Sequence, residues 1–238
     1  MSTPARIKTL KIDGKDVSAR DDQTILDAAA ENGIAIPTLC CLENLTPWGG
    51  CRLCVVEVKS SRKLLPACTT LVDEGMEVST DSERLHFYRR MIVELLLSER
   101  NHICSVCVSN GHCELQALAQ KLGITHVHVP YRYPRLDVDS SHDRFRQDQN
   151  RCVLCTRCIR VCDQIEGAHT KDLKDRGVEA QVINDLNQPW GDSQTCTSCG
   201  KCVHVCPTGA LTEKGTAAGE MKKHGQFLPY LALMREAE

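Results

Sequence analysis

The sequence predicts an α+β protein whose interior is organised around cysteine. Three observations support this prediction. Strand-like alternation and a short helical pattern share residues 1–79, apolar helical stripes follow, and 16 of the 238 residues are cysteines gathered in four groups. The aromatic content of 4% is low, so other groups must help to fill the interior. Clustered thiols are more typical of metal ligands than of disulfides in a chain that opens without a signal-peptide pattern.

Residues 1–79 are predicted to form a first domain that opens with a β-hairpin. Residues 6–12 alternate polar and apolar side chains, residues 13–16 supply a turn, and Val17 begins the return strand. A helix over residues 24–32 should end at Gly33, and further strands are expected at residues 54–58 and 76–78. These elements indicate a small domain with a helix packed across a mixed sheet.

Residues 80–124 are predicted to form a second, helical domain. Thr80 and Glu83 match a capping box, so Thr80 is the expected N-cap of a helix that runs to about Ser98. A second helix over residues 114–122 should be closed by Gly123. The first helix carries an apolar stripe expected to face a core: Leu85, Tyr88, Ile92, Leu95 and Leu96.

The remaining segments are a connection, a third domain and a tail. Residues 125–149 contain prolines and a polar Asp/Ser cluster, which favour a connecting segment on the surface. Residues 150–215 form the third domain. Residues 216–238 form a tail whose apolar part, residues 227–234, is either a packed helix or an element that docks another subunit.

The third domain carries two similar cysteine runs. A cubane [4Fe-4S] cluster needs four thiolates, and in two-cluster ferredoxins a tight loop supplies three while the last cysteine of each run crosses to the other cluster. Structural zinc is the alternative, but zinc ribbons pair two Cys-x2-Cys knuckles rather than two runs of four. The two predicted ligand sets are Cys152, Cys155, Cys158 and Cys206, and Cys162, Cys196, Cys199 and Cys202.

The first domain carries a differently spaced set. Plant-type [2Fe-2S] sites also combine a spaced first ligand, a Cys-x2-Cys pair and a distant fourth thiolate, although with other gaps. Gly49 and Gly50 would let backbone N–H groups approach the sulfides. Cys41 is left over, either as a small buried side chain or as a ligand in place of Cys40. The predicted [2Fe-2S] ligands are Cys40, Cys51, Cys54 and Cys68.

The second domain offers only three thiolates, from Cys104, Cys107 and Cys113. A nearby histidine can complete a four-ligand site. His102 is the expected [4Fe-4S] ligand, and His112 or a further thiolate is the alternative. A neutral imidazole in place of an anionic thiolate should raise the reduction potential of that cluster.

Charge and missing motifs restrict the function. A formal net charge of -2 gives no basic excess for binding nucleic acid, and no apolar stretch is long enough to span a membrane. No nucleotide-binding glycine motif is present, and no catalytic residue or NAD or FMN site is assigned to this chain. Four oxidised clusters would add roughly -7 to the charge. Basic side chains beside the ligands, such as Arg52, Arg157 and Lys201, either compensate for this charge or are solvated at the surface.

Taken with its predicted hairpin and helix, the first domain resembles the [2Fe-2S] ferredoxin-like, β-grasp domain that opens the iron-sulfur subunit of complex I and iron-only hydrogenases. The second domain resembles the His-Cys cluster domain of these proteins, and the third domain resembles their two-[4Fe-4S] ferredoxin-like domain. In those families a His-x3-Cys-x2-Cys-x5-Cys motif holds the second cluster. Here that rule places Arg100 at the histidine position, and a protonated guanidinium has no lone pair to give.

The chain stops within a short tail, which makes it most similar to the small diaphorase subunit of the NAD(P)-linked bidirectional [NiFe] hydrogenase. The resemblance implies one [2Fe-2S] and three [4Fe-4S] clusters, an electron-transfer role within an oxidoreductase complex, and no active site of its own. Implied partners are a flavin subunit that holds FMN and oxidises NAD(P)H, and the small and large hydrogenase subunits. The expected location is cytoplasmic, with or without peripheral membrane association.

Two other functions are kept as alternatives. The chain is also compatible with an electron-input subunit of an NAD-linked formate dehydrogenase or a complex I-like enzyme. A zinc-stabilised interaction module without a redox role is the alternative from a different class.

Overall fold

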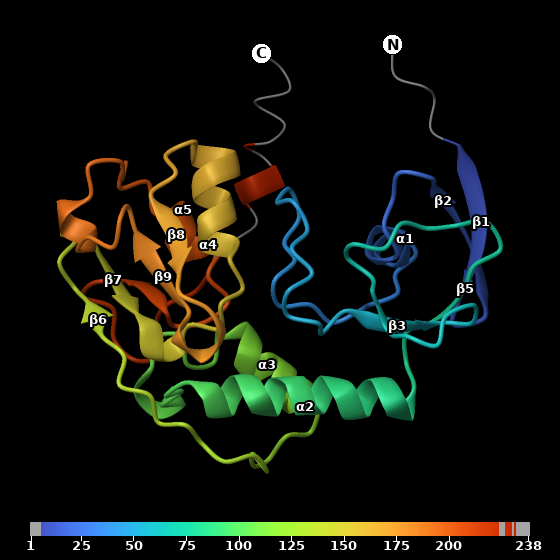
Figure 1. The fold of residues 1–238 in the computed structure, drawn as a ribbon, viewed down its shortest axis with the longest axis horizontal. Coiled ribbons are helices and arrows are strands. Elements are labelled where there is room, and N and C mark those ends of the chain that lie inside the picture. Colours follow the sequence, from blue (N-terminus) through green and yellow to red (C-terminus); the bar gives the residue numbers. More distant parts are fainter. Residues whose placement is uncertain (1–5, 224–226, 230, 232–238) are drawn as a thin grey trace. The chain divides into compact units, whose positions relative to one another are not determined.

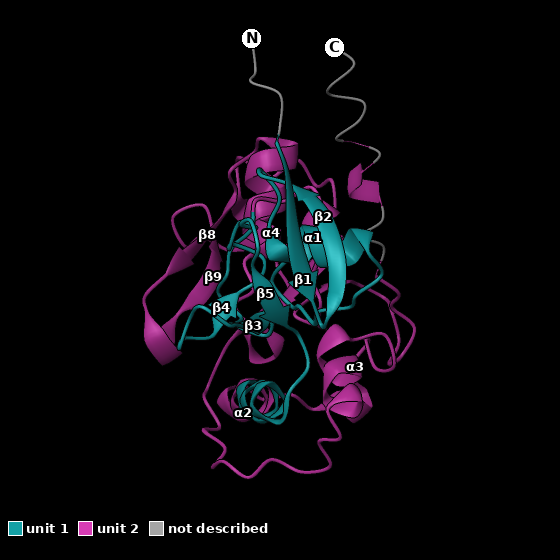
Figure 2. Ribbon diagram, turned by 90° about the vertical axis from the view of Figure 1, so that its right-hand side faces the viewer, with its two compact units in different colours: residues 1–41, 47–92 teal, residues 42–46, 93–238 magenta. Residues whose placement is uncertain are grey.

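The computed structural model describes residues 6–223, 227–229 and 231, and the chain divides into two compact units. The first unit takes the chain up to Cys41 and from Pro47 to Ile92 (Figure 2). The second takes Leu42–Thr46 and the chain from Val93 onward. Within the described part of the chain, no helix has the length and apolar character that crossing a membrane requires.

The first unit is built on a five-stranded mixed sheet in the order β2-β1-β5-β3-β4. β1 runs antiparallel to β2 and parallel to β5. The hairpin turn at Asp13 and Gly14 has positive φ at both residues, which matches the twist of the paired strands. The strands are β1 (Ile7–Ile12), β2 (Lys15–Arg20), β3 (Val55–Val58), β4 (Leu65–Pro66) and β5 (Glu77–Ser79).

Helix α1 (Ile25–Glu31) covers one face of this sheet (Figure 1). Thr24 caps the helix, and its side chain and that of Asp27 satisfy each other's backbone N–H groups. Ile25, Ala28 and Ala29 are buried against the inward-facing residues of the strands, which alternate along β1 and β2 as Leu10, Ile12, Val17 and Ala19. The predicted hairpin, helix and sheet are therefore present, and the short strand β4 is an addition.

Helix α2 (Glu83–Glu99) begins later than its predicted cap. Thr80 was expected to be the N-cap, but its N–H and hydroxyl donate to the carboxylate of Asp13 instead. The N–H of Leu85 donates to the hydroxyl of Ser82 over 3.2 Å, so Ser82 caps the helix. The prediction was wrong because a residue distant in sequence competes for Thr80.

The buried face of α2 also differs from the predicted stripe. Leu95 was placed on that stripe but is 47% exposed, whereas Leu85, Arg89 and Val93 are buried. Arg89 is accommodated because its guanidinium donates to the carbonyls of Leu53, Val55 and Thr80 over 2.9–3.1 Å. The hydrophobic pattern could not predict that a charged side chain, Arg89, is buried between Leu85 and Val93 on the same face of the helix.

The second unit contains two small antiparallel sheets, β10-β7-β6 and β8-β9. β6 (Val138–Asp139) and β7 (Phe145–Asp148) lie in the segment expected only to connect domains. β7 is buried and pairs with β10, with Gln147 opposite Leu211. The remaining elements are η1 (Cys104–Val106), α3 (Glu114–Lys121), η2 (Gln149–Arg151), α4 (Arg157–Arg160), η3 (Val161–Glu166), β8 (Lys171–Lys174), η4 (Gly177–Glu179), β9 (Gln181–Asn184), η5 (Trp190–Asp192), α5 (Lys201–His204) and β10 (Leu211–Glu213).

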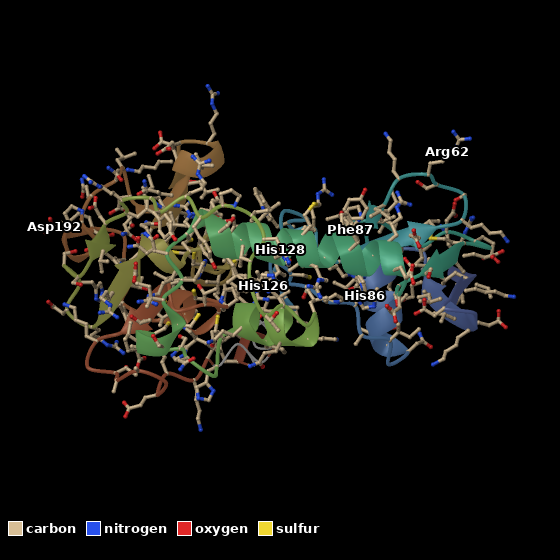
Figure 3. The ribbon with its side chains drawn as sticks, turned by 90° about the horizontal axis from the view of Figure 1, so that it is seen from below. Arg62, His86, Phe87, His126, His128 and Asp192 are labelled. Atoms are coloured by element: carbon tan, nitrogen blue, oxygen red, sulfur yellow. The ribbon has the colours of Figure 1, made fainter. Side chains whose placement is uncertain are left out.

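The first part of the predicted connection runs beside α2. Nδ1 of His128 lies 3.1 Å from the buried carboxylate of Glu94, and the rings of His126 and His128 are 4.1 Å apart (Figure 3). Part of the predicted tail element also packs within the second unit, since Leu228 is fully buried in its core. Residues 230 and 232–234 of that element lie outside the described residues.

Candidate metal centres

The first unit gathers the four thiols predicted to hold a binuclear cluster. Sγ of Cys54 lies 3.4 Å from Sγ of Cys68, and the Cys51 thiol is hydrogen-bonded to Cys40. A disulfide requires about 2.05 Å between sulfurs, so these are thiols. The hydrogen bond with Cys68 and burial raise the pKa of Cys54 well above its ordinary value. The protons of such crowded thiols are those that a metal would displace.

The surrounding backbone fixes these thiols. β3 starts directly after Cys54, and Ala67, just before Cys68, donates its N–H to the Cys54 carbonyl over 3.0 Å. Gly50 precedes Cys51, and a Cβ there would lie 1.9 Å from Nε1 of Trp48. The sequence suggested that Gly50 admits a cluster closely. The structure adds that the indole of Trp48 already occupies the space of a side chain.

Cys41 lies close to this group without being part of the two thiol pairs. The hydrogen bond with Cys54 lowers the pKa of Cys68 below its ordinary value. Negative charges on Cys40 and Cys41 act in the opposite direction but are outweighed. Cys40 is 1% exposed and Cys41 is half-buried. The hydrogen bond between Cys40 and Cys51 favours Cys40 as the ligand, which remains a prediction.

The second thiol group lies at the start of the second unit. The N–H of Cys107 donates to the carbonyl of Cys104 over 3.1 Å, and Cys113 directly precedes α3. A Cβ on Gly209 would lie 2.3 Å from Sγ of Cys107, so only glycine fits beside this sulfur. Burial raises the pKa of Cys113 to about 11.

His102 has the hydrogen bonding expected of a metal ligand. Its Nε2 is buried and has no partner among the described residues, while the ring is hydrogen-bonded to the carbonyl of Leu96. Nδ1 therefore makes that bond, and Nε2 keeps a lone pair. Burial, aided by the charge of Arg151, lowers the pKa of His102 to about 4, so the ring is neutral at pH 7. This orphaned nitrogen fits a metal.

Arg100, which stands where the related motif has histidine, has a different role. It is 3% exposed, and its Nη2 donates to the carbonyl of Ala180 over 2.8 Å. Its guanidinium lies 3.9 Å from the carboxylate of Glu99. Arg100 thus links the end of α2 to the segment of Ala180 within the second unit.

The two cysteine runs line two separate cavities. Cys206 lies with the first run and Cys162 with the second, so the last cysteine of each run joins the other group. This is the exchange that the sequence analysis proposed. One cavity is lined by Cys152, Cys155, Cys158 and Cys206, and the other by Cys162, Cys196, Cys199 and Cys202.

The two ligand loops have the same backbone conformation. Leu154 precedes Cys155 and has φ of 51°, and Ser198 precedes Cys199 and has φ of 56°. The residues after these cysteines, Thr156 and Gly200, also have positive φ. Left-handed conformations are costly for residues other than glycine and are concentrated at functional sites. Both loops therefore store strain to direct three cysteines inward.

Burial keeps four of these eight thiols protonated without metal: Cys152, Cys155, Cys158 and Cys202. It raises the pKa of Cys152 to about 11 and those of Cys155 and Cys202 to about 12. Cys199 is the exposed member of its set. Thiols that are gathered in fours around a cavity, most of them buried or half-buried, are chemically suited to iron-sulfur clusters.

The expected counter-charges are arranged differently from the prediction. Arg157 is buried, but Glu114 neutralises it through contacts of 2.6 and 2.9 Å, and Lys201 is ion-paired with Glu166. Arg52 is exposed. Lys171 is a further buried cation, and it lines one of the cavities. The sequence did not reveal it because it lies 25 residues before Cys196, outside the cysteine runs.

Three protein-family models match successive parts of the chain. Residues 6–83 match a 2Fe-2S iron-sulfur cluster binding domain. Residues 89–128 match the NADH-ubiquinone oxidoreductase-G iron-sulfur binding region. Residues 143–212 match the ferredoxin-like domain of NADH-quinone oxidoreductase subunit 3. The predicted fold class and the presence of both kinds of iron-sulfur domain are thereby confirmed.

Known proteins share most of the chain. The gamma subunit of the NAD-reducing hydrogenase HoxS from Cupriavidus necator is 32% identical over 206 residues, covering 86% of each chain. A crystal structure of an NAD+-reducing [NiFe]-hydrogenase in the H2-reduced state matches with a TM-score of 0.83 and 33% identity over 88% of both chains. A putative formate dehydrogenase from Bacillus subtilis, YrhE, is 35% identical over 97% of this chain. YrhE and other relatives are much longer, and the chain spans only 24% to 36% of their length.

Proposed function

The chain belongs to the family of NAD-linked hydrogenase subunits that includes HoxS gamma, and from this premise we propose that it relays electrons through four bound iron-sulfur clusters. The observation that carries the proposal is the gathering of cysteines into groups of four around two cavities. Such clusters, when bound, supply one-electron acceptors whose potentials depend on the surrounding protein.

The proposed ligands are distributed over both units. Cys40, Cys51, Cys54 and Cys68 hold one [2Fe-2S] cluster in the first unit. His102 joins Cys104, Cys107 and Cys113 around a [4Fe-4S] cluster, with Nε2 as the ligand atom and the Leu96 carbonyl orienting the ring. Two further [4Fe-4S] clusters are held by the cysteines of the two cavities.

The three cubane sites of the second unit are close enough to form a wire. Cys113 and Cys206 belong to different sites, yet the residues that follow them are joined by a hydrogen bond, from the N–H of Glu114 to the carbonyl of Pro207, of 2.9 Å. Gly209 packs on the sulfur of Cys107 and lies three residues after Cys206. The chain's contribution is to hold these sites in a compact, largely water-excluding core.

The chemistry at the ends of the wire is assigned to partners. We propose a flavin subunit that holds FMN and oxidises NAD(P)H on one side, and the small and large hydrogenase subunits on the other. The chain itself has no assigned nucleotide site or catalytic residue. The reduced thiols that this function requires favour a cytoplasmic location.

A formate dehydrogenase is the second candidate for the complex, because YrhE matches nearly the whole chain. The electron-transfer role of this chain would be the same in both complexes. Co-purification distinguishes the two: a [NiFe] hydrogenase subunit supports the first assignment, and a formate-oxidising subunit supports the second.

Metal and sulfide analysis of anaerobically isolated protein tests the proposed wire. One binuclear and three cubane centres require about fourteen irons per chain, with an equal amount of acid-labile sulfide. Visible absorption that is bleached by a reductant should accompany them. If the protein were colourless and contained a few zinc ions and no sulfide, the electron-transfer function would be wrong and the cysteines would have a structural role.

A further inference from the structure

Lys171 is a buried cation with neutral hydrogen-bond partners. It begins β8 and is 4% exposed. Its Nζ donates to Oε1 of Gln147 over 2.9 Å and to Oδ1 of Asn184 over 2.8 Å. Nζ also lies 3.7 Å from the centre of the Trp190 ring. The fold thus positions the ammonium group without neutralising it.

No carboxylate among the described residues comes within ion-pairing distance of Lys171. The lysines that form ion pairs there are Lys8, Lys11, Lys59 and Lys201. The carboxylate of Asp139 accepts bonds from Ser141 and from the N–H of Trp190 instead. Asp139 interacts with Lys171 only from beyond ion-pairing distance. A buried ammonium without a carboxylate in contact is unfavourable, so the fold favours a further anion close to Nζ.

One thiol-lined cavity contacts this lysine directly, and the other contacts one of its hydrogen-bond partners. Lys171 itself lines the cavity that contains Cys162 and the second cysteine run. Gln147, its hydrogen-bond partner, lines the cavity that contains Cys206 and the first run. The charge of Lys171 also acts on both groups, because it opposes the burial that raises the pKa values of Cys158 and Cys202.

We propose that Lys171 is the shared counter-charge of the two [4Fe-4S] clusters in these cavities and raises the reduction potential of both. The proposal rests on the proposed function, since it requires clusters at these sites. Each centre gains one negative charge when it accepts one electron, and no bond to its ligands forms or breaks. A fixed positive charge therefore stabilises the reduced form more than the oxidised form.

Redox titration of the intact, metal-loaded protein, followed by EPR, tests this role. Lys171→Met removes the charge, and Asn184→Asp neutralises it with a nearly isosteric partner that lines neither cavity. Each should reduce the equilibrium constant for one-electron reduction of two cubane centres about tenfold, a shift of about 59 mV for a one-electron couple. This is the size expected for charges roughly 10 Å apart at an effective dielectric constant of about 20. The binuclear centre serves as an internal reference.

Two matched variants separate charge from structure. Lys171→Arg keeps the charge and should retain the wild-type potentials, and Lys174→Met removes a lysine from the other end of β8 and should also retain them. Unchanged potentials in iron-replete Lys171→Met or Asn184→Asp protein would overturn the proposal, as would a shift of only one centre. Wild-type protein that lacks iron and sulfide would overturn the proposed function itself.

Discussion

The indole Nε1–H of Trp190 donates a hydrogen bond of 3.2 Å to the sulfur of Cys196. Trp190 is 1% exposed and stacks on Phe145 with ring centres 5.5 Å apart. The donor is therefore held in place by packing. Hydrogen bonds to cluster sulfurs are one of the factors that set reduction potentials.

Replacement of Trp190 by Phe should lower the potential of a single cubane centre. The variant removes the donor to Cys196 and keeps most of the ring volume. We expect a few-fold decrease in the reduction equilibrium constant of the cluster in the cavity lined by Cys196, detected by EPR-monitored titration. Trp48→Phe alters a half-exposed ring of the first unit and is the control. A uniform shift of all centres would contradict this assignment.

His102 should be essential for one cubane centre and replaceable by a thiolate. His102→Ala leaves the cluster of Cys104, Cys107 and Cys113 without its fourth protein ligand and should remove or convert that EPR signal. His102→Cys should preserve the signal and lower its potential, because a thiolate adds negative charge. His112→Ala should change neither the EPR signal nor the reduction potential of this cluster. If the EPR signal were lost in His112→Ala protein and retained in His102→Ala protein, His112 would be the ligand instead.

Cys40 and Cys41 should respond differently to serine substitution. Cys40→Ser is expected to abolish or strongly perturb the binuclear EPR signal, since Cys40 is hydrogen-bonded to Cys51 within the thiol group. Cys41→Ser should leave the signal and the iron content unchanged. The reverse pattern would mean that the ligand is displaced by one residue.

Removal of the metal should leave thiols that ionise only at unusually high pH. Burial raises the pKa of Cys152 to about 11 and that of Cys155 to about 12, compared with about 8.5 for an unperturbed thiol. The folded chain retains protons that the unfolded chain releases, so metal-free protein should lose stability as the pH rises above about 8.5. Thiolate absorbance near 240 nm, with circular dichroism as the check on folding, measures this. Ionisation of Cys152 and Cys155 near pH 8.5 in folded protein, resolved by comparison with the serine variants, would contradict it.

Arg89 should stabilise the loop that carries Cys51 and Cys54. Arg89→Met would leave the carbonyls of Leu53, Val55 and Thr80 without this donor. We expect a loss of about 2–4 kcal/mol in the free energy of unfolding, measured by urea denaturation. Arg84→Met removes an exposed arginine of the same helix, paired with Glu57, and should change stability by less than about 0.5 kcal/mol.

Local patterns were sufficient for most elements and for the choice of thiols. The alternation of Leu10 and Ile12, and the apolar positions of α1, depend on neighbours within a few residues. Non-local competition explains the errors. Thr80 is drawn away from α2 by Asp13, 67 residues earlier. The pairing of β7 with β10 converts a polar segment near Phe145 into a buried strand.

The sequence by itself determined which side chains can ligate metal, because Cys-x2-Cys spacing is a property of one short loop. Only the tertiary structure decided that Nε2 of His102 has no partner among the described residues, and that Lys171 lines one thiol-lined cavity while its partner Gln147 lines the other. The partners of Lys171 lie 24 and 13 residues away. The electrostatic surroundings of a site depend on which distant segments are packed together, and that information is absent from any local pattern.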